Sequence, residues 1–295
     1  MEMTVIELLN RTTRYFEDHQ VENPRLQAEL LMAQSLGLNR EGLYIHLKDR
    51  LSDGAKERLE EFVRRRASGE PLQYILGKQE FWSGDFRVDP RVLIPRPETE
   101  ILVEQALSIL STIPFERTPS VLEIGTGSGA VAISLLREAK NLLIMATDIS
   151  REALLLAREN ARGMGVLREI IFVNGDLFGP FHSRKEGPFD LILSNPPYIS
   201  RPEIETLPRE IREHEPAIAL NGGEDGLDFY RNIVRQAPSY LRKEGWLLLE
   251  LGQGQGERIT ELIHEIGAFS KPDLLKDLSG IERVVKAQKK REGRG

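Results

Sequence analysis

Hydrophobic residues follow two different patterns along the chain. Over residues 1–75 they recur every three or four positions, which is typical of one face of an amphipathic helix. Capping and turn residues in the same region predict several helices joined by short turns, and therefore a small helical bundle. The helices are expected to start after Thr4, to run from Pro24 to Gly37, to include a short piece at 43–45, and to start again after Ser52.

Glycine and proline become frequent between residues 70 and 100, where they interrupt any long helix. Two short stretches, Glu80-Phe81-Trp82 and Phe86-Arg87-Val88, predict a hairpin that turns at Ser83-Gly84-Asp85. We expect this hairpin to link two domains. The chain then divides into a helical domain at 1–75, a linker at 76–95 and a second domain at 96–295.

The segment 94–100 precedes a predicted helix at 101–110 and carries Arg96 and Thr99 among prolines and acidic residues. One interpretation is a rigid linker that caps the helix, and the other is the edge of a lid over a pocket. The sequence favours neither. Two basic runs, Arg64-Arg65-Arg66 at a helix end and the tail 286–295, are both interpreted as solvated.

From residue 120 onward, short apolar runs typical of buried strands alternate with helical patterns. Such alternation predicts an α/β domain with a parallel sheet covered by helices on both faces. Ligands then bind at the carboxyl ends of the strands, where the strand order reverses. Strands are expected at 121–124, 142–147, 170–173, 189–193, 246–251, near 271–275 and at 281–286, and helices at 130–138, 151–164, 227–241 and 255–266.

A glycine-rich loop follows the first of these strands. Gly125-Thr126-Gly127-Ser128-Gly129 comes directly before a predicted helix, and glycine lets the backbone approach a ligand closely. The loop is compatible with a dinucleotide site, with an S-adenosylmethionine site, or with a tight turn that holds no ligand. Its spacing differs from the G-x-G-x-x-G of dinucleotide sites, and Glu123 lies two residues ahead of it.

Acidic residues follow the next two strands. Asp148 ends the second strand, where its carboxylate can accept from both hydroxyls of a ribose; the alternative is a cap on the helix that begins near Arg151. Asp176 follows the third strand and is expected to accept from an adenine amino group, with Leu177 and Phe178 beside the base. The alternative for Asp176 is a simple turn residue.

The most informative stretch is Asn195-Pro196-Pro197-Tyr198, which follows the strand at 189–193. Two consecutive prolines cannot continue a sheet, and the residue before a proline is held in extended geometry. The Asn195 side chain and the Pro196 carbonyl then offer two acceptors beside the flat ring of Tyr198. This arrangement predicts a clamp for a planar group with an NH2, either an amide or a nucleobase. The alternative is a proline turn with a chance Asn and Tyr.

Composition narrows the class of protein. Of the 295 residues, 40% are apolar and 29% are charged, as in ordinary globular proteins. A net charge of −6 argues against a broad polyanion-binding face, although it leaves room for a local basic patch. The absence of cysteine excludes disulfides, thiolate chemistry and Cys-ligated zinc, and no metal site is expected. The chain shows neither a secretory leader pattern nor an apolar run of the roughly 20 residues needed to span a bilayer, so we expect a cytoplasmic location.

Taken together, the motifs resemble the protein-(glutamine-N5) methyltransferases that act on peptide chain release factors, the family known as HemK or PrmC. The resemblance covers nearly the whole chain. It is carried by GEPLQYILG (69–77), EFW (80–82), IPRPETE (94–100), EIGTGSG (123–129), SNPPYI (194–199) and LLLELG (247–252). The Asn-Pro-Pro-Tyr motif alone also occurs in DNA and RNA amino-methyltransferases. Leu177 stands where some relatives carry Trp, which leaves the packing of the adenine open.

The resemblance implies a class I S-adenosylmethionine-dependent methyltransferase fold, which is Rossmann-like with a mostly parallel seven-stranded sheet, behind a small helical domain. The implied reaction transfers a methyl group from S-adenosylmethionine to the glutamine side-chain nitrogen of the Gly-Gly-Gln loop in bacterial release factors 1 and 2. The implied cofactor-binding residues are Glu123, Gly125, Thr126, Gly127, Ser128, Gly129, Asp148, Asp176, Leu177 and Asn195. The implied catalytic residues are Asn195, Pro196 and Tyr198, and Pro197 completes the substrate-binding clamp.

The helical domain is then expected to dock the release factor. The enzyme is expected to be a monomer that contacts neither membrane nor nucleic acid directly. Three other classes remain as alternatives. An N-methyltransferase of exocyclic amino groups in DNA or RNA is disfavoured because the chain has no basic stripe for phosphates. An adaptor that has lost catalysis would bind cofactor without methyl transfer, and a dinucleotide oxidoreductase is disfavoured by the glycine spacing.

Overall fold

The computed structural model describes residues 3–114, 116–139, 141–181 and 187–291. The chain divides into two compact units. The first comprises Met1–Lys78 together with Pro208–His214, and the second comprises Gln79–Leu207 and Glu215–Gly295. The hydrophobic pattern gave no sign that residues 208–214 belong to the helical unit. The three-part division at residues 75 and 95 stays a prediction.

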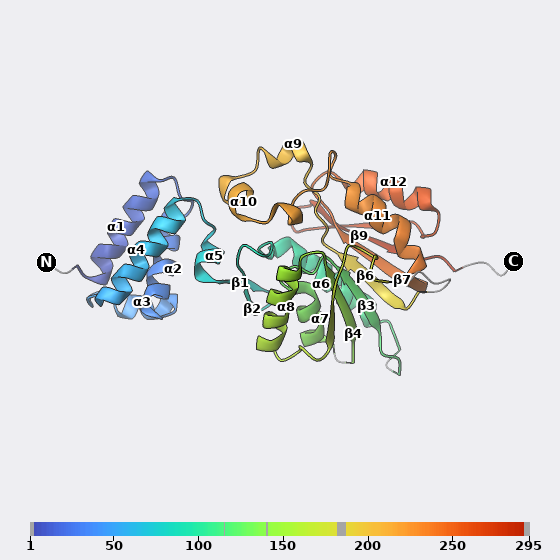
Figure 1. Ribbon diagram of the computed structural model, residues 1–295, viewed down its shortest axis with the longest axis horizontal. Coiled ribbons are helices and arrows are strands. Elements are labelled where there is room, and N and C mark those ends of the chain that lie inside the picture. The colour runs from blue at the N-terminus through green and yellow to red at the C-terminus, as the bar shows by residue number, and fades with distance from the viewer. Residues whose placement is uncertain (1–2, 115, 140, 182–186, 292–295) are drawn as a thin grey trace. The chain divides into compact units, whose positions relative to one another are not determined.

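The helical unit has the helices that the periodicity predicts, together with two short ones that it does not predict, α5 and α10 (Figure 1). Its elements are α1 (Val5–Asp18), α2 (Pro24–Leu36), α3 (Arg40–Ile45), α4 (Asp53–Ala67), α5 (Leu72–Leu76) and α10 (Arg209–His214). The predicted starts are correct, because Thr4 donates to the Glu7 carboxylate ahead of α1 and the Ser52 hydroxyl accepts from the Ala55 N–H ahead of α4. The helices enclose a core that includes Leu9, Phe16 and Leu31.

The prediction of a solvated end for α4 is wrong for two of its three arginines. Arg66 is only 7% exposed and donates to Gln27 Oε1 at 2.6 Å, to the Glu70 carbonyl at 3.0 Å and to Glu210 Oε2 at 2.8 Å. Arg65 forms a two-pronged ion pair with the Glu70 carboxylate. A carboxylate 144 positions away in the sequence therefore helps to bury Arg66, whereas Arg65 is held by the nearby Glu70 and stays partly exposed.

The second unit is built on a seven-stranded sheet of order β5-β4-β3-β6-β7-β9-β8. The first five strands in this order are parallel, and β9 is antiparallel to both β7 and β8. The sequence order runs outward from β3 through β4 to β5 on one side and from β6 to β7 on the other, so β3 and β6 flank the switch point. The strands are β3 (Ser120–Ile124), β4 (Leu143–Asp148), β5 (Ile170–Asn174), β6 (Phe189–Ser194), β7 (Leu241–Glu250), β8 (Asp273–Lys276) and β9 (Glu282–Gln288).

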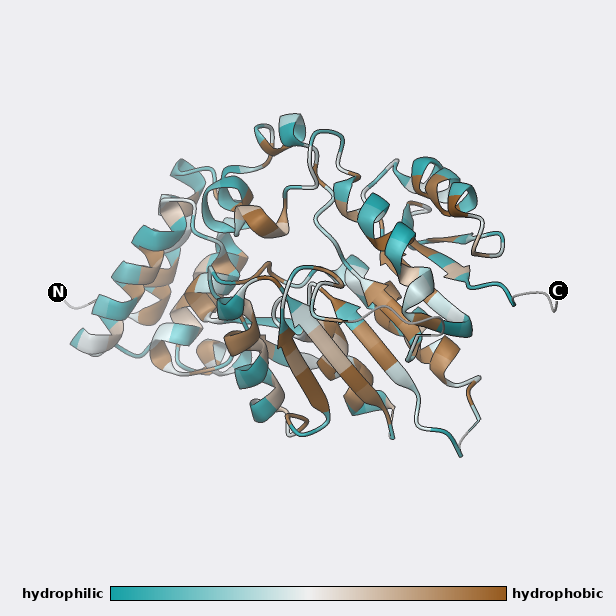
Figure 2. Ribbon diagram, turned by 45° about the vertical axis from the view of Figure 1, so that its right-hand side comes forward, coloured by the Kyte–Doolittle hydropathy of each residue, from teal (hydrophilic) through white to brown (hydrophobic). Residues whose placement is uncertain are grey.

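Helices cover both faces of this sheet, because adjacent strand residues contribute to opposite cores. Val121 packs with the helices of one face, whereas Leu122 packs with those of the other. The first face carries α6 (Glu100–Leu110), α7 (Ala130–Glu138) and α8 (Arg151–Gly163), and the second carries α11 (Asp228–Gln236) and α12 (Gly256–Ile266). Figure 2 shows the central strands in brown and helices with one brown and one teal side, which is the pattern of a sheet buried on both faces.

Several boundaries differ from the predictions. The helix predicted at 227–241 ends at Gln236 and continues as a short 3₁₀ helix, because Pro238 supplies no N–H for an α-helix. Leu241 already begins β7. The long loop after β6 contains two unpredicted short elements, α9 (Arg201–Ile204) and η2 (Ala217–Ala219), besides α10.

The predicted hairpin is present as β1 (Lys78–Phe81) and β2 (Gly84–Arg87), but its turn is at Trp82-Ser83 and not at 83–85, because Trp82 and Ser83 take up the positive φ values of the turn. The C-terminal segment is not frayed up to residue 291, because Lys289 Nζ donates to the Pro238 and Leu241 carbonyls at 2.6 and 2.9 Å. The rest of the predicted solvated tail, 292–295, lies outside the described residues. Throughout the described part of the chain, every helix is too short or too polar to cross a bilayer.

Candidate active site

A cavity of about 400 Å³ lies at the carboxyl ends of the parallel strands in the second unit. Its size is typical of sites for small molecules and cofactors. Eleven of the predicted site residues line it, and Gly129 and Tyr198 do not. The lining set is Glu123, Gly125, Thr126, Gly127, Ser128, Asp148, Asp176, Leu177, Asn195, Pro196 and Pro197.

Strand register explains why these distant residues meet. Ile124 at the end of β3 lies opposite Thr147 of β4 on one side and Ser194 of β6 on the other. The glycine loop after Ile124 and the Asn195 turn after Ser194 therefore leave adjacent strands at the same level. Because β3 and β6 flank the switch point, their loops diverge and leave the crevice that forms the cavity.

The glycines of the loop have two separate functions. Gly127 has a φ of +55° and a Cβ built on it would meet no atom within 4 Å, so its side faces open space. Gly129 has a φ of +81°, and a Cβ there would lie 2.9 Å from Ile133 Cδ1 and 3.2 Å from Ala157 Cβ. Gly127 thus leaves room for a ligand, whereas Gly129 allows α7 and α8 to pack closely.

Glu123 lies behind the loop and is 4% exposed. The Thr126 hydroxyl donates to its Oε2 atom at 2.6 Å. Burial is the main cause that raises the pKa of Glu123 to about 8, so the carboxyl is largely protonated at neutral pH. The buried carboxyl of Glu123 therefore holds the glycine loop through the Thr126 hydroxyl while it carries little negative charge.

Asp148 connects the glycine loop to the end of β4. Its Oδ2 atom accepts the Gly127 N–H and its Oδ1 atom accepts the Ser150 N–H, both at 2.8 Å. The alternative role of helix cap is wrong, because the Ser150 hydroxyl caps α8 by accepting from the Ala153 N–H at 3.1 Å. Burial raises the pKa of Asp148. Each carboxylate oxygen keeps a second lone pair for a ligand hydroxyl.

Two of the three residues expected around a base line the cavity, and their contact with a base stays a prediction. Asp176 and Leu177 line the cavity, but Phe178 does not. Phe178 is 1% exposed and stacks on Tyr240 with ring centroids 4.5 Å apart, so its predicted place beside the base is wrong. Ile149 lines the cavity and is 52% exposed. An apolar residue directly after a strand-ending acid is a signal that could have identified it.

Asn195, Pro196 and Pro197 line the cavity, while the end of this turn is held by contacts on its other side. The Asn195 amide nitrogen donates to Thr99 Oγ1 at 3.2 Å. Gln255 donates to the Tyr198 carbonyl at 2.9 Å, and the half-buried Tyr198 ring packs against the core under α11 and α12. Burial raises the pKa of Tyr198 to about 12, so its hydroxyl stays neutral. Stacking of this ring on a substrate amide stays a prediction.

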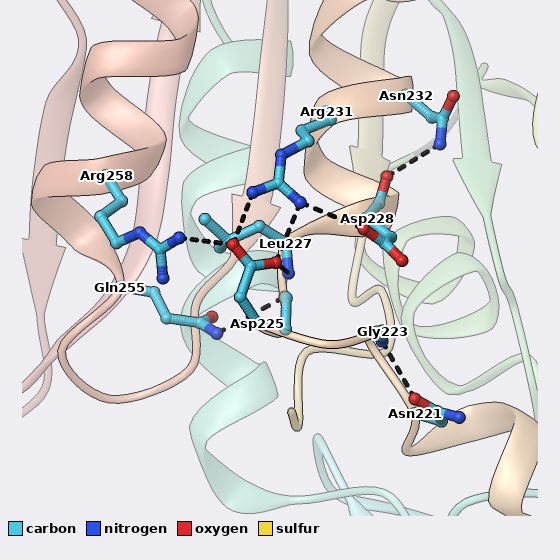
Figure 3. Close-up of polar contacts among 10 residues, drawn as sticks. Asn221, Gly223, Asp225, Leu227, Asp228, Arg231, Asn232, Gln255 and Arg258 are labelled. Carbon is cyan, nitrogen blue, oxygen red and sulfur yellow. Dashed lines mark hydrogen bonds and ion pairs between the residues drawn. The ribbon is translucent and has the colours of Figure 1, made fainter. Parts of the chain in front are cut away.

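A loop at 220–227 supports the same turn. The Ile199 N–H donates to the Leu220 carbonyl and the Gly222 N–H donates to the Ile199 carbonyl. Figure 3 shows how this loop is anchored: Arg231 of α11 and Arg258 of α12 converge on the carboxylate of Asp225. These arginines hold the pKa of Asp225 well below its usual range. Two helices thereby fix the loop on which the turn rests.

The segment 94–99 forms one edge of the cavity. Arg96 pairs with the buried Glu215, which also accepts the Ile94 N–H at 3.1 Å, and this pair joins the segment 94–99 to the loop at 215–219. The interpretation of 94–100 as a cavity edge is therefore correct in position, and the same segment also leads directly into α6. The cavity lining also includes Arg91, Val92, Leu93, Pro95, Ser150, Pro216, Ile218, Ala219, Asp228, Phe229 and Asn232, most of them in loops or helix starts with no motif.

The fold and the cavity define the class of protein as a class I S-adenosylmethionine-dependent methyltransferase. The glycine loop and Asp148 at adjacent strand ends fit such a cofactor, because the loop leaves space and the carboxylate keeps free lone pairs. A methyltransferase from Pyrococcus furiosus has a similar fold, with a TM-score of 0.51 and 21% identity over 70% of this chain and 89% of that one. The described residues contain no cluster of His, Cys, Asp and Glu that could hold a metal ion.

The particular family is shown by sequence comparison. The PrmC N-terminal domain matches residues 7–77 and the methyltransferase small domain matches residues 103–213. The chain is 43% identical to the release factor glutamine methyltransferase of Geobacter sulfurreducens, over 96% of this chain and 95% of that protein. It is 40% identical to that of Moorella thermoacetica, over 98% of this chain and the whole of that protein. The chain belongs to the family of release factor glutamine methyltransferases.

Proposed function

We propose that this enzyme methylates the side-chain nitrogen N5 of the glutamine in the Gly-Gly-Gln loop of peptide chain release factors. The observation that carries the proposal is the position of Asn195 and Pro196 beside the glycine loop, at the switch point of the sheet. The names of the relatives support the substrate, since they describe release factor glutamine methyltransferases over nearly the full chain.

The difficulty of the reaction lies in the nucleophile. An amide nitrogen shares its lone pair with the carbonyl and must lose this planarity in order to attack. Acceptance of its two N–H bonds by Asn195 Oδ1 and the Pro196 carbonyl would orient the nitrogen and stabilise the positive charge that develops on it. S-adenosylmethionine, when bound, supplies a methyl group that its sulfonium has already activated.

A general base is not needed before the transfer, because the proton can leave the nitrogen afterwards. Among the described residues that line the cavity there is neither histidine nor lysine, in keeping with this route. The chain's own contribution is therefore positioning, with Pro196 and Pro197 fixing the backbone that carries the acceptors.

The cofactor contacts belong to the same proposal. Gly125 and Gly127 leave room for the ligand, Asp148 accepts from the ribose hydroxyls, and Asp176 and Leu177 lie near the base. The helical domain would dock the body of the release factor, a role supported by the match of residues 7–77 to the PrmC N-terminal domain. We propose that both release factors 1 and 2 are substrates of a cytoplasmic, monomeric enzyme.

Labelled methyl transfer tests the function directly. The enzyme is incubated with labelled S-adenosylmethionine and a release factor, or with a release factor whose Gly-Gly-Gln glutamine is replaced by alanine. Label is expected on the first protein alone. Equal labelling of both proteins would overturn the proposal.

A further inference from the structure

A buried acid lies directly behind Asn195. Glu250 is the last residue of β7, within the stretch 247–252 to which the mechanism assigns no role, and it is 2% exposed. The pairing of β6 with β7 sets Ser194 opposite Leu249, so the next residues along the two strands, Asn195 and Glu250, are neighbours. Glu250 does not line the cavity itself.

The side chain of Glu250 has few partners for so buried a carboxyl. Thr99 and Asn195 lie close enough to lower the pKa of this carboxyl, while its Oε2 atom has no hydrogen-bond partner among the described residues. The Tyr230 hydroxyl donates at 2.7 Å to the backbone carbonyl of Glu250 and not to its carboxyl group. Burying a carboxyl with so little compensation costs stability, so its presence calls for another explanation.

The two contacts of the Asn195 amide supply that explanation. One N–H of its NH2 group donates to Thr99 Oγ1 at 3.2 Å. The Glu250 carboxyl lies close to the same group, because Ser194 and Leu249 pair across β6 and β7 and the amide lowers the pKa of the carboxyl. With the amide nitrogen turned toward Thr99, the acceptor Oδ1 is the end left for the substrate. A rotated amide would bring Oδ1 against the carboxylate, where two acceptors repel each other.

We propose that Glu250, together with Thr99, is a positioning residue that fixes the Asn195 amide with its oxygen facing the reacting glutamine nitrogen. The inference rests on the proposed function. A carboxylate can only accept, so it enforces one orientation of the amide, whereas a protonated carboxyl can donate to the oxygen and permits both. A carboxylate behind the amide also polarises it and makes Oδ1 a stronger acceptor.

The value of kcat should therefore depend on whether the Glu250 carboxyl is ionised. Burial, with a smaller contribution from Glu98, raises the pKa of Glu250 to about 7 against the opposing effects of Thr99, Arg283 and Asn195. The side chains of Tyr198 and Tyr230 remain neutral. We expect kcat to fall as the pH drops below about 7, because the orienting carboxylate is lost. Glu123, which also titrates near neutral pH, acts on the glycine loop and should change cofactor affinity instead.

The test compares Glu250→Gln with the wild-type enzyme in transfer to a release factor. The variant keeps the size of the side chain but can donate to Asn195 Oδ1, so kcat should fall by about 10- to 100-fold, as for other misplaced catalytic groups. The step in kcat near pH 7 should disappear, and the Kd for S-adenosylmethionine should change less than about twofold, because the cofactor contacts are left in place. An unchanged kcat and pH profile, or a parallel loss of cofactor binding, would overturn the inference.

Thr99 provides the second variant in case Glu250→Gln does not fold. Thr99→Ser keeps the hydroxyl and should retain activity, whereas Thr99→Val should lose it with cofactor binding intact; equal activity of the two would count against the role. The side-chain NH2 resonances of Asn195 should titrate near pH 7 in the wild type and not in Glu250→Gln, a readout that needs no turnover. If the wild-type enzyme itself fails to methylate release factors, the proposed function falls and this inference with it.

Discussion

The backbone N–H of Gly127 donates a 2.8 Å hydrogen bond to the Oδ2 atom of Asp148. This bond ties the loop after β3 to the end of β4, so the same carboxylate shapes the loop and faces the cavity. Asp148→Asn is expected to raise the Kd for S-adenosylmethionine by about 10- to 100-fold, since a hydrogen bond to a charged group contributes ~1.5–3 kcal/mol. Calorimetric titration measures the change.

The control for this prediction is Asp273→Asn, which removes an equal charge from an exposed position on β8. Its Kd should match that of the wild type. If Asp148→Asn and Asp273→Asn bind S-adenosylmethionine with the same Kd, Asp148 only stabilises the turn between β4 and α8.

The two glycines Gly127 and Gly129 should respond differently to alanine. Gly129→Ala must push a Cβ against Ile133 and Ala157, so it should lower the free energy of unfolding by about 1–3 kcal/mol from overpacking, besides the cost of its positive φ. Gly127→Ala has no such clash and should cost only ~1–2 kcal/mol for its φ, but it should weaken cofactor binding more. Denaturant unfolding and cofactor titration of both variants separate the effects, and identical profiles would contradict the division of roles.

The raised pKa of Glu123 makes stability depend on pH. The unfolded carboxyl titrates near 4.5 and the folded one near 8, so between these values the folded state binds more protons than the unfolded state. Stability contributed through this group is therefore lost as the pH rises from about 5 to 8, with a slope of up to ~1.4 kcal/mol per pH unit. Glu123→Gln should remove that slope. Unfolding measured at several pH values checks it, and a variant with the wild-type slope would refute the assignment.

The alternation of strands and helices could be predicted because β3, β6 and β7 each contain a short buried apolar run, at 121–122, 191–193 and 247–249. The Asn195 turn could be predicted because two prolines leave the backbone little choice. The orientations of the Phe178 and Tyr198 side chains could not be predicted, because they depend on packing partners that are distant in the sequence, such as Tyr240 for Phe178.

The short elements between residues 199 and 226 were missed for a related reason. A helix of one or two turns has little propensity of its own and forms when tertiary contacts hold it. The loop at 220–227 depends on Asp225 and its two arginines from α11 and α12, and no local pattern reveals that cluster. Glu250 was part of a recognised stretch, but its position behind Asn195 requires the register of β6 and β7.

Asn195 should matter more for transfer than for cofactor binding. Asn195→Ala removes an acceptor that would be used fully only as the substrate nitrogen becomes charged, so kcat should fall by about 100-fold or more. The Kd for S-adenosylmethionine should stay within a few-fold of the wild-type value. Single-turnover transfer and cofactor titration measure the two quantities. Equal losses in both would mean that Asn195 chiefly builds the cofactor pocket.

Arg66 should be a major stabilising residue of the helical unit. Its buried guanidinium donates hydrogen bonds to Gln27, to the Glu70 carbonyl and to Glu210. Arg66→Met leaves these acceptors without a donor, so it should lower the free energy of unfolding by about 2–4 kcal/mol. Glu210→Gln should cost less than about 1 kcal/mol, because the Glu210 side chain is 42% exposed and water replaces part of the interaction. Both variants should nevertheless make residues 208–214 more sensitive to protease, since Arg66 is a partner of α10 within this unit. Denaturant unfolding and limited proteolysis test the two effects, and a protease-resistant 208–214 segment in Arg66→Met would show that other contacts hold α10.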